Sequence, residues 1–230
     1  MSLKEDLELE VKEIFKEKWA KREGRVVPSS DNLQLSNDAI MLDGVVMYAD
    51  MSASTKLVDS KKAFFAAEIY KSYLHCAAKV IRSEGGEITA YDGDRIMAVF
   101  IGDYKNTSAT RAALKINYAR INIINPAIKN QYPDESYQVN HTIGIDNSNL
   151  FIARTGIRGA NDLVWVGRAA NHAAKLCNLP NSYPTRITAD VYNCLNESVK
   201  FSNGQSMWEE ASWIDMGRTI YRSTWWWSIS

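Results

Sequence analysis

The chain has 230 residues, of which 46% are hydrophobic and 23% charged, proportions that are ordinary for a globular protein of one or two domains. Its formal net charge is zero, which argues against bulk binding to nucleic acid or to an anionic membrane. No apolar run is long enough to cross a bilayer, and the charged N-terminus lacks the apolar core of a signal peptide. We therefore expect a cytoplasmic protein without nucleic-acid partners or direct membrane association. Cys76, Cys177 and Cys194 form no CxxC pair, which favours reduced thiols.

The first part of the chain predicts a helix followed by a linker. Apolar residues recur at helical spacing over residues 3–24, with Lys and Glu between them. Residues 25–37 lose this period and contain Pro28, which is typical of a loop. The helix either packs on its own domain or contacts a partner subunit. We predict an N-terminal helix and linker over residues 1–37 and a single globular domain over residues 38–230.

The stretch VVMYADMSAST, residues 45–55, is an apolar run that ends in Asp50 and continues into small polar residues. The run predicts a buried strand, and Asp43-Gly44 before it predicts a tight hairpin turn. A helical pattern follows over residues 54–83. Asp50 is then expected at a strand end facing a helix start, where backbone N–H groups can bind phosphate and a carboxylate can bind Mg²⁺. Alternatively, Asp50 or Ser52 only caps the helix.

A second hairpin is predicted over residues 86–100, with its turn at Asp92-Gly93 and with Asp94 in the turn region. Strands and helices alternate after it, so we predict an α+β fold with a central mixed or antiparallel sheet. The remaining expected elements are a helix over 106–124, a strand pair over 141–146 and 149–153, a strand over 163–167, a helix over 168–179, a strand and helix over 186–195, and a terminal strand over 220–230.

The C-terminal segment contains three consecutive tryptophans, Trp225, Trp226 and Trp227. In an extended chain the first and third point one way and the second points the other way. Stacking on a nucleobase is one possible use, but packing in the core or at a dimer contact is the interpretation we favour.

Two carboxylates stand out, because Asp50 and Asp94 both lie at strand ends or turns beside small residues. If their hairpins are neighbours, the two side chains can hold two divalent cations. A metal pair of this kind activates an attacking oxygen and neutralises phosphate charge. Spacing alone does not separate this site from ordinary Asp-Gly turns.

Three motifs, in the same order, resemble the catalytic domain of class III adenylate and guanylate cyclases. VVMYADMSASTKL is similar to their strand–DIxGFT–helix opening, and GGEITAYDGDRIMAVF is similar to their GDxxMAxF hairpin. TIGID followed by WVGRAANHAAKL resembles their GI…GxxVNxAxRL segment. The resemblance covers residues 38–200. It implies a class III cyclase fold with a ferredoxin-like core, and makes residues 38–230 the catalytic domain.

The resemblance also implies roles for individual residues. Asp50 and Asp94 match the two aspartates that bind two divalent cations, Mn²⁺ or Mg²⁺, and Met51 matches the residue whose carbonyl oxygen assists them. Asn171 matches the asparagine that orients the ribose. Lys175 stands where the family has a transition-state arginine, and it keeps the positive charge but loses the bidentate fork. Asn171 and Lys175 are one helical turn apart and share a face.

The triphosphate contacts follow from the same resemblance. A loop of four residues is expected to cradle the phosphates with its backbone N–H groups, and Ala53 there replaces a glycine. That change is tolerable if the backbone is not left-handed. The family's C-terminal phosphate-binding lysine has no clear match; Arg218 and Arg222 are candidates, and we prefer Arg222. The loop residues are Ser52, Ala53, Ser54 and Thr55.

The base pocket departs from that of purine cyclases. Ala90 and Val164 occupy the two base-reading positions, and neither can pair with a purine edge; each unpaired buried polar group costs about 1–3 kcal/mol. Tyr48 and Arg95 add bulk and polarity, which suits a smaller base. These features resemble the short standalone cyclases of the bacterial Pycsar anti-phage system, which make cyclic UMP or cyclic CMP, and we favour UTP. The alternatives are an adenylate cyclase with an unusual pocket, or an inactive domain that binds nucleotide or a partner.

In this family the active site forms between two catalytic domains arranged head to tail. A single chain here carries both motif halves, so the resemblance implies a homodimer with two composite sites. Asp50 and Asp94 of one subunit would act with Asn171 and Lys175 of the other. The implied reaction is attack of the ribose 3′-oxygen on the α-phosphorus with release of pyrophosphate. The product would act as a second messenger on a separate cyclic-nucleotide-sensing effector.

Overall fold

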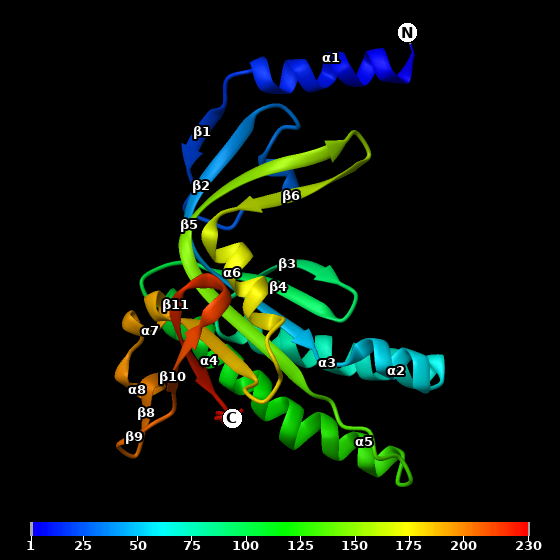
Figure 1. Cartoon of the computed structure of the whole chain (residues 1–230), viewed down its shortest axis with the longest axis vertical. Helices are drawn as coiled ribbons and strands as arrows, with labels where there is room; N and C mark the ends of the chain where they lie inside the picture. Colours follow the sequence, from blue (N-terminus) through cyan, green and yellow to red (C-terminus); the bar gives the residue numbers. More distant parts are fainter. Residues whose placement is uncertain (1, 230) are drawn as a thin grey trace. The chain divides into compact units, whose positions relative to one another are not determined.

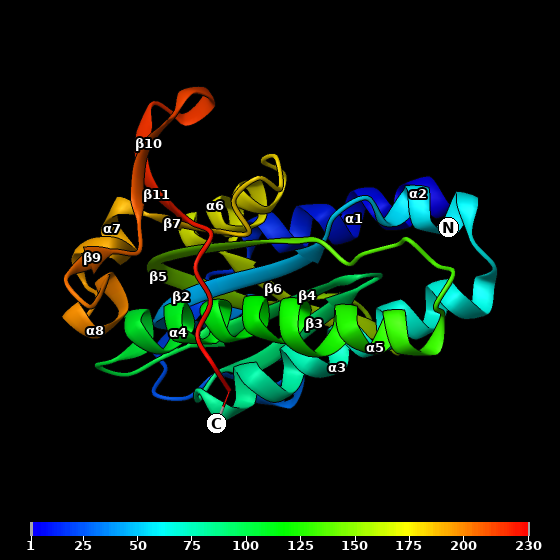
Figure 2. The ribbon, with the colours of Figure 1, turned by 90° about the horizontal axis from the view of Figure 1, so that it is seen from below.

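The computed structural model describes residues 2–229, whose helices and strands are shown in Figures 1 and 2. They form two compact units, one of Met1–Asp43 with Ser148–Arg168 and the other of Gly44–Asn147 with Ala169–Ser230. Two long strands, β2 (Asp38–Met51) and β5 (His141–Ile157), contribute residues to both units. The predicted domain boundary after residue 37 stays a prediction. No helix of the described chain is long and apolar enough to cross a membrane.

The smaller unit contains a helix and two strand pairs. β1 pairs in parallel with the start of β2, and the end of β5 pairs antiparallel with β6. The predicted first helix is shorter than expected. It ends at Lys16 because the side-chain amide of Asn37 donates to the carbonyl oxygens of Ile14 and Glu17, both at 2.8 Å. The elements are α1 (Leu3–Lys16), β1 (Ala20–Glu23), η1 (Ser30–Asn32), part of β2, part of β5, and β6 (Ala160–Val166).

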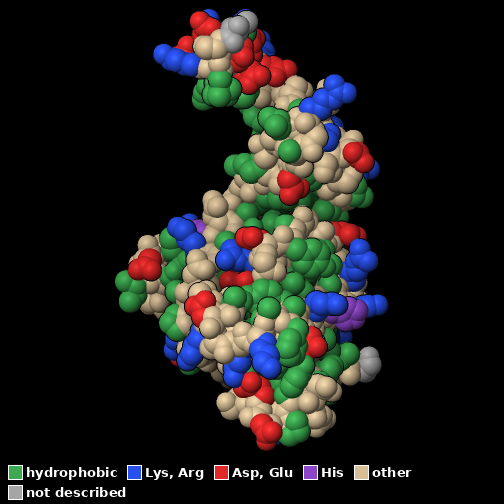
Figure 3. Space-filling model, turned by 90° about the vertical axis from the view of Figure 1, so that its right-hand side faces the viewer, with side chains coloured by type: hydrophobic (Ala, Val, Ile, Leu, Met, Phe, Trp, Pro, Cys, Tyr) green, Lys and Arg blue, Asp and Glu red, His purple; other side chains and the backbone are tan. Residues whose placement is uncertain are grey.

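Helix α1 buries none of its residues. Its apolar side chains, Leu7 and Ile14 among them, are about half exposed or more. Figure 3 shows hydrophobic side chains on one side of this helix, at the top of the view, with charged side chains around the rest. The amphipathic pattern is therefore real. The first of the two alternatives, packing on its own unit, is not observed among the described residues.

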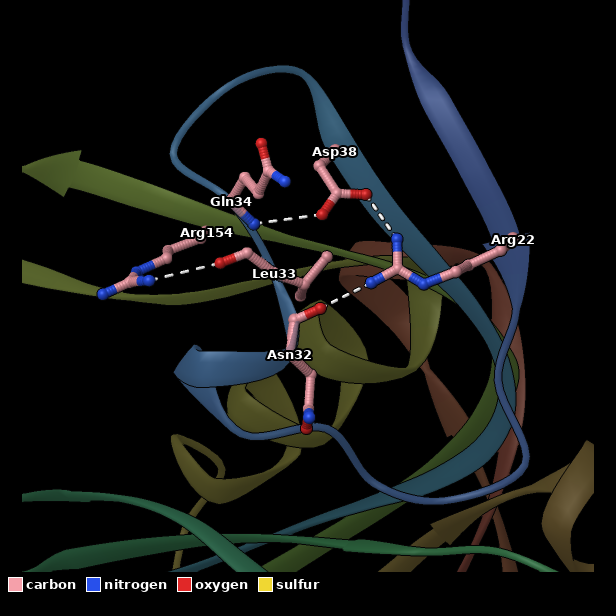
Figure 4. A network of polar contacts seen from close by, with 6 residues as sticks. All are labelled: Arg22, Asn32, Leu33, Gln34, Asp38 and Arg154. Atoms are coloured by element: carbon pink, nitrogen blue, oxygen red, sulfur yellow. Dashed lines mark hydrogen bonds and ion pairs between the residues drawn. The ribbon is translucent and has the colours of Figure 1, made fainter.

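A polar network organises the segment that the sequence predicts as a linker (Figure 4). Arg22 on β1 donates to Asp38 on β2, and the amide of Gln34 donates to the same carboxylate at 3.0 Å. Arg154 on β5 donates to the carbonyl oxygen of Leu33 at 3.2 Å. Burial alone would raise the pKa of Asp38, but the hydrogen bonds from Gln34 and Arg22 lower it below its usual value. The loop is thus fastened to strands β1, β2 and β5.

The larger unit is a mixed sheet covered by helices, in the order β10-β11-β7-β5-β2-β4-β3. β5 and β7 run parallel, and the β2–β4, β3–β4, β7–β11 and β10–β11 pairs are antiparallel. Figure 2 shows α3 and α4 on one side of this sheet and α6 on the other. The α+β prediction is confirmed. The elements are α2 (Ser54–Ser60), α3 (Ala63–Ser83), β3 (Glu87–Asp92), β4 (Arg95–Phe100), α4 (Lys105–Ala119), the π-helix η2 (Arg120–Ile124), α5 (Asn125–Gln131), α6 (Arg168–Cys177), β7 (Thr185–Thr188), α7 (Ala189–Asn193), α8 (Glu197–Lys200), β8 (Phe201–Ser202), β9 (Gln205–Ser206), β10 (Glu209–Trp213), η3 (Ile214–Met216) and β11 (Arg218–Ser223).

Two predicted turns are absent from the described chain, because β2 and β5 are continuous strands. Gly44 lacks the positive φ that a tight type I′ turn requires. The first part of β2 pairs with β1 and its last part with β4. β5 likewise pairs first with β7 and later with β6. Each strand changes its partner along its length, and the chain therefore continues straight through the two places where a turn was predicted.

The predicted helices lie where expected, but their lengths differ from the prediction. The pattern over residues 54–83 is interrupted at Lys61 and Lys62, which are extended and separate α2 from α3. The next helical stretch continues past residue 124 through a π-helical turn into α5. Pro126 does not mark a loop, as a proline at this point would suggest, but lies in the first turn of α5, where a missing N–H is harmless.

The C-terminal segment is anchored on α4, although the last strand ends at Ser223. Asn117 donates to the carbonyl oxygen of Trp225 at 2.9 Å, and the amide of Trp227 donates to a carbonyl oxygen of α4 at 3.1 Å. Trp225 and Trp227 pack against the core, whereas Trp226 is 48% exposed. The predicted alternation and the preference for core packing are confirmed.

Candidate active site

The two aspartates singled out in the sequence lie at the same end of the sheet. Asp50 is the last residue but one of β2 and lies directly opposite Arg95, the first residue of β4. Arg95 also pairs with Asp92 across the β3–β4 hairpin, so the intervening turn carries Asp94 beside Asp50. Gly93 takes a φ of 60° at the first turn position, as a type II′ turn requires. The predicted second hairpin is thereby confirmed.

Two carboxylates and one arginine meet at this end of the sheet. Burial raises the pKa of Asp50, and the charge of Asp94 adds to that rise, while Arg95 opposes it. Arg95 forms an ion pair with Asp50, with Nη2 at 3.4 Å from Oδ2. The Oδ2 atom of Asp94 is buried and has no hydrogen-bond partner within residues 2–229. Two neighbouring carboxylates are the hard oxygen ligands that a divalent cation prefers.

The protein supplies only part of a coordination shell. No group of three or more His, Cys, Asp or Glu side chains gathers at one point in the described part of the chain. Met51, whose carbonyl oxygen is the third predicted ligand, is buried and ends β2 next to Asp50. The remaining ligands would then be oxygens of a substrate phosphate or of water, as is common for Mg²⁺.

The loop that follows differs from expectation at two positions. The amide of Ser52 donates to the carbonyl oxygen of Asn140 at 2.8 Å, so it is already used and is not free for phosphate. Ala53 is left-handed, with φ 60° and ψ 32°, which is the conformation that makes the replacement of glycine costly. The first bond of α2 runs from Leu57 to Ala53, so the amides of Ser54 and Thr55 have no partner within the helix.

Asn171 and Lys175 lie on the exposed face of α6, one turn apart as predicted. The opposite face of α6 packs on β5 at Gly144, where an added Cβ would come within 2.2 Å of the Ala173 carbonyl oxygen. Lys175 Nζ lies 3.6 Å from the sulfur of Met216, in the turn between β10 and β11. No hydrogen bond or ion pair within residues 2–229 joins these two side chains to Asp50 or Asp94.

Three of the four predicted base-pocket residues share one face of the sheet. Tyr48 and Ala90 both lie opposite Met97, one on each side of it, and directly paired residues point to the same face. Arg95 belongs to this face too, and its guanidinium lies 5.8 Å from the Tyr48 ring centroid. Val164 is on β6 in the smaller unit and is 38% exposed.

Comparison with known proteins decides the family. The chain is 52% identical to a protein named uridylate cyclase from Xanthomonas perforans, over the full length of both chains. A protein of the same name from Burkholderia cepacia is 53% identical, also over both full lengths. The chain belongs to the uridylate cyclase family. No family model matches it.

The chain has the class III cyclase fold. The crystal structure of the adenylyl cyclase CyaB from P. aeruginosa matches it with a TM-score of 0.69 at 16% identity. The match covers 81% of this chain and 95% of that one. The predicted fold is confirmed by this likeness.

The two candidate phosphate-binding arginines of the chain, Arg218 and Arg222, have different surroundings. Arg222, the preferred phosphate ligand, forms an ion pair with Glu209, and its guanidinium lies 4.0 Å from the ring centroid of Tyr183. Arg218 begins β11, is exposed, and follows the turn that contains Met216. Arg222 therefore already has a carboxylate partner in the free protein. Its contact with phosphate stays a prediction.

Sequence reasoning gave no role to three polar side chains beneath this corner. The hydroxyls of Tyr73 and Tyr137 and both ring nitrogens of His141 are buried without hydrogen-bond partners among the described residues. Their spacing in the sequence carries no motif. Only the fold, which brings α3 and the start of β5 together under the strand ends, reveals them.

Proposed function

We propose that the protein is a uridylate cyclase that converts UTP into cyclic UMP and pyrophosphate. The observation that carries the proposal is the identity of 52% with a protein of that name, over the full length of both chains. The meeting of Asp50 and Asp94 at one corner of the sheet supports it. In the reaction the ribose 3′-oxygen bonds to the α-phosphorus, and the bond from that phosphorus to the leaving pyrophosphate breaks.

The residues of the corner divide the work. Asp50, Asp94 and the carbonyl oxygen of Met51 would hold two Mn²⁺ or Mg²⁺ ions. When bound, such ions supply positive charge that favours the deprotonated 3′-oxygen and offsets phosphate charge. The first-turn amides of α2, those of Ser54 and Thr55, would donate hydrogen bonds to the triphosphate. Asn171 orients the ribose through its side-chain amide.

Lys175 would stabilise the charge that develops on the departing phosphates. Its ammonium is a point charge, so it neutralises without the fixed geometry of an arginine fork. We expect Lys175→Ala to reduce kcat by at least about tenfold while changing nucleotide affinity little, because the contact strengthens in the transition state. Steady-state kinetics and nucleotide-binding calorimetry on the same variant check this. An equal loss in binding and in kcat/KM would assign Lys175 to ground-state binding instead.

We propose that the site is completed by a second copy of the chain. Asn171 and Lys175 face outward from α6, where a partner subunit can meet them. Mixing Asp50→Ala protein with Asn171→Ala protein should then restore activity, because one heterodimer site receives two intact halves. Each variant alone should be inactive. If folded variants exchange subunits and no activity returns, the composite site is wrong.

The base pocket supports a pyrimidine substrate, with UTP favoured over CTP. Ala90 and Val164 offer no donor or acceptor to a purine edge, and Tyr48 with Arg95 provides a larger polar wall. Purified protein should be incubated separately with ATP, GTP, CTP and UTP, each with Mn²⁺, and the products identified by mass spectrometry. Cyclic UMP is the expected product. Cyclic AMP would instead favour an adenylate cyclase with an unusual pocket, and no product would favour an inactive binding domain.

We propose an anti-phage role for this activity, on the resemblance to standalone pyrimidine cyclases. The product would act on a separate effector in the cytoplasm. Bacteria that express the protein together with a cyclic-nucleotide-sensing effector should form fewer phage plaques than bacteria that express the Asp50→Ala variant with the same effector. Equal plaque counts would contradict the defence role while leaving the enzymatic proposal intact.

A further inference from the structure

Three polar side chains under the candidate metal site have no hydrogen-bond partner in the described chain. They are the hydroxyl of Tyr73, which is fully buried, the hydroxyl of Tyr137, and both ring nitrogens of His141, which is 1% exposed. A buried polar group without a partner destabilises a fold, so native proteins keep few of them without a reason. Three in one region therefore need an explanation.

The three side chains lie close to the loop that follows Asp50. The rings of Tyr73 and His141 are 5.7 Å apart between centroids. His141 directly follows Asn140, whose carbonyl oxygen accepts the amide of Ser52 at 2.8 Å. Tyr137 lies in the same segment, which leads into β5. These contacts place the cluster beneath the end of β2, on the side of α3.

Asp94 offers an acceptor near the two tyrosines. Its Oδ2 atom is buried and unpaired, so it points into the protein and not toward solvent. Its negative charge is felt at both tyrosines, where it adds to the effect of burial, which raises the pKa of Tyr137 to about 12. Burial and the nearby Arg120 hold the pKa of His141 well below its usual value, so the ring stays neutral and does not repel a cation.

The chemistry of the cluster suits bridging water. Two hydroxyls and a neutral imidazole can donate, and a carboxylate oxygen can accept, yet none of these atoms forms a hydrogen bond within residues 2–229. Ordered water typically occupies such polar gaps, because it makes about three hydrogen bonds to groups that would otherwise be unpaired.

We propose that Tyr73, Tyr137 and His141 are positioning residues that hold the inner oxygen of Asp94 through ordered water, so that its outer oxygen faces the divalent cations. The inference rests on the proposed metal site. Partners that orient a ligating carboxylate typically change metal affinity by 10–100-fold when they are removed. The polar atoms of these residues contribute little to the stability of the fold, because they make no direct hydrogen bond to another described residue.

The test separates metal affinity from stability. Tyr73→Phe and Tyr137→Phe each remove one hydroxyl and keep the ring. We expect each variant to bind Mn²⁺ 10–100-fold more weakly, measured by electron paramagnetic resonance titration without nucleotide. We expect the melting temperature to change little, because each hydroxyl makes no direct hydrogen bond to a protein group. Tyr132→Phe is the matched control, since its hydroxyl donates to Glu68 at the surface, and its Mn²⁺ affinity should not change.

The outcomes are distinct. Wild-type Mn²⁺ affinity in both Tyr73→Phe and Tyr137→Phe overturns the positioning role. If one variant fails to fold, the other decides. A large fall in melting temperature without a change in Mn²⁺ affinity shows a purely structural role and also overturns it. If the Phe variants lose Mn²⁺ affinity but the wild-type protein makes no cyclic UMP, the inference stands and the proposed substrate falls. Wild-type protein that binds no Mn²⁺, either alone or with a UTP analogue that lacks the 3′-hydroxyl, overturns both the metal site and this inference.

Discussion

Replacing Ala53 by glycine is expected to stabilise the protein. Ala53 precedes α2 in the left-handed region, with φ 60° and ψ 32°, and its side chain is exposed. A left-handed conformation costs an L-residue roughly 1–2 kcal/mol, because Cβ crowds the following carbonyl oxygen. Glycine removes that cost. It also makes the unfolded chain more flexible, which lowers the free energy of unfolding by about 0.4–1 kcal/mol.

The net gain for Ala53→Gly is therefore about 0–1.6 kcal/mol in the free energy of unfolding, with a central value of about 0.8 kcal/mol. For a chain of this size that central value corresponds to a rise of about 1–4 °C in melting temperature. Circular dichroism in a thermal or urea titration measures it. The matched control is Ala67→Gly, at an exposed site inside α3, where the same change should destabilise by about 1 kcal/mol.

The opposite signs of these two substitutions make the test strict. If Ala53→Gly lowers the melting temperature as Ala67→Gly does, Ala53 is not strained and the reasoning fails. Equal gains at both sites would point to a general effect of glycine and would refute the strain at Ala53 just as firmly. A stabilised Ala53→Gly variant would show that the chain tolerates strain at the start of α2.

Two further predictions concern packing and charge. Gly144→Ala should lower the free energy of unfolding by roughly 1–3 kcal/mol or more, because the new Cβ would lie 2.2 Å from a carbonyl oxygen of α6; an unchanged melting curve would contradict the tight packing. Since the pKa of Asp38 is lowered in the folded state, its contribution is complete above about pH 4, the unfolded value, and is lost as the pH falls through the folded pKa. Urea titrations should therefore show that Asp38→Asn removes part of the acid sensitivity of the wild-type protein, and identical pH profiles would refute that role.

Local patterns predicted the elements of the sheet better than their connections. The turn at Asp92-Gly93 was predictable because Gly93 must take a positive φ there. The same dipeptide pattern at Asp43-Gly44 was misleading, since Gly44 lies inside one long strand. Which strand pairs with each part of β2 is a tertiary property, and no window of the sequence carries it.

The candidate site shows the same division. Asp50 and Asp94 could be proposed from the chain because their motifs are local and keep their order. The occupied amide of Ser52 could not be, because its acceptor, Asn140, is far along the sequence. The unpaired hydroxyl of Tyr73 could not be foreseen either, since burial without a partner depends on every neighbour that the fold supplies.

The length of β2 separates the pairing of its first residues from that of its last. Fourteen residues form a single strand that pairs with β1 at its start and with β4 at its end. Side chains alternate along a strand, so a slip of one residue between β2 and β4 would turn Asp50 and Tyr48 to the opposite face relative to Arg95 and Met97. A slip of one residue between β1 and β2 would displace only the short strand β1. The orientation of the candidate metal ligand therefore depends on the β2–β4 register and not on the N-terminal strand pair.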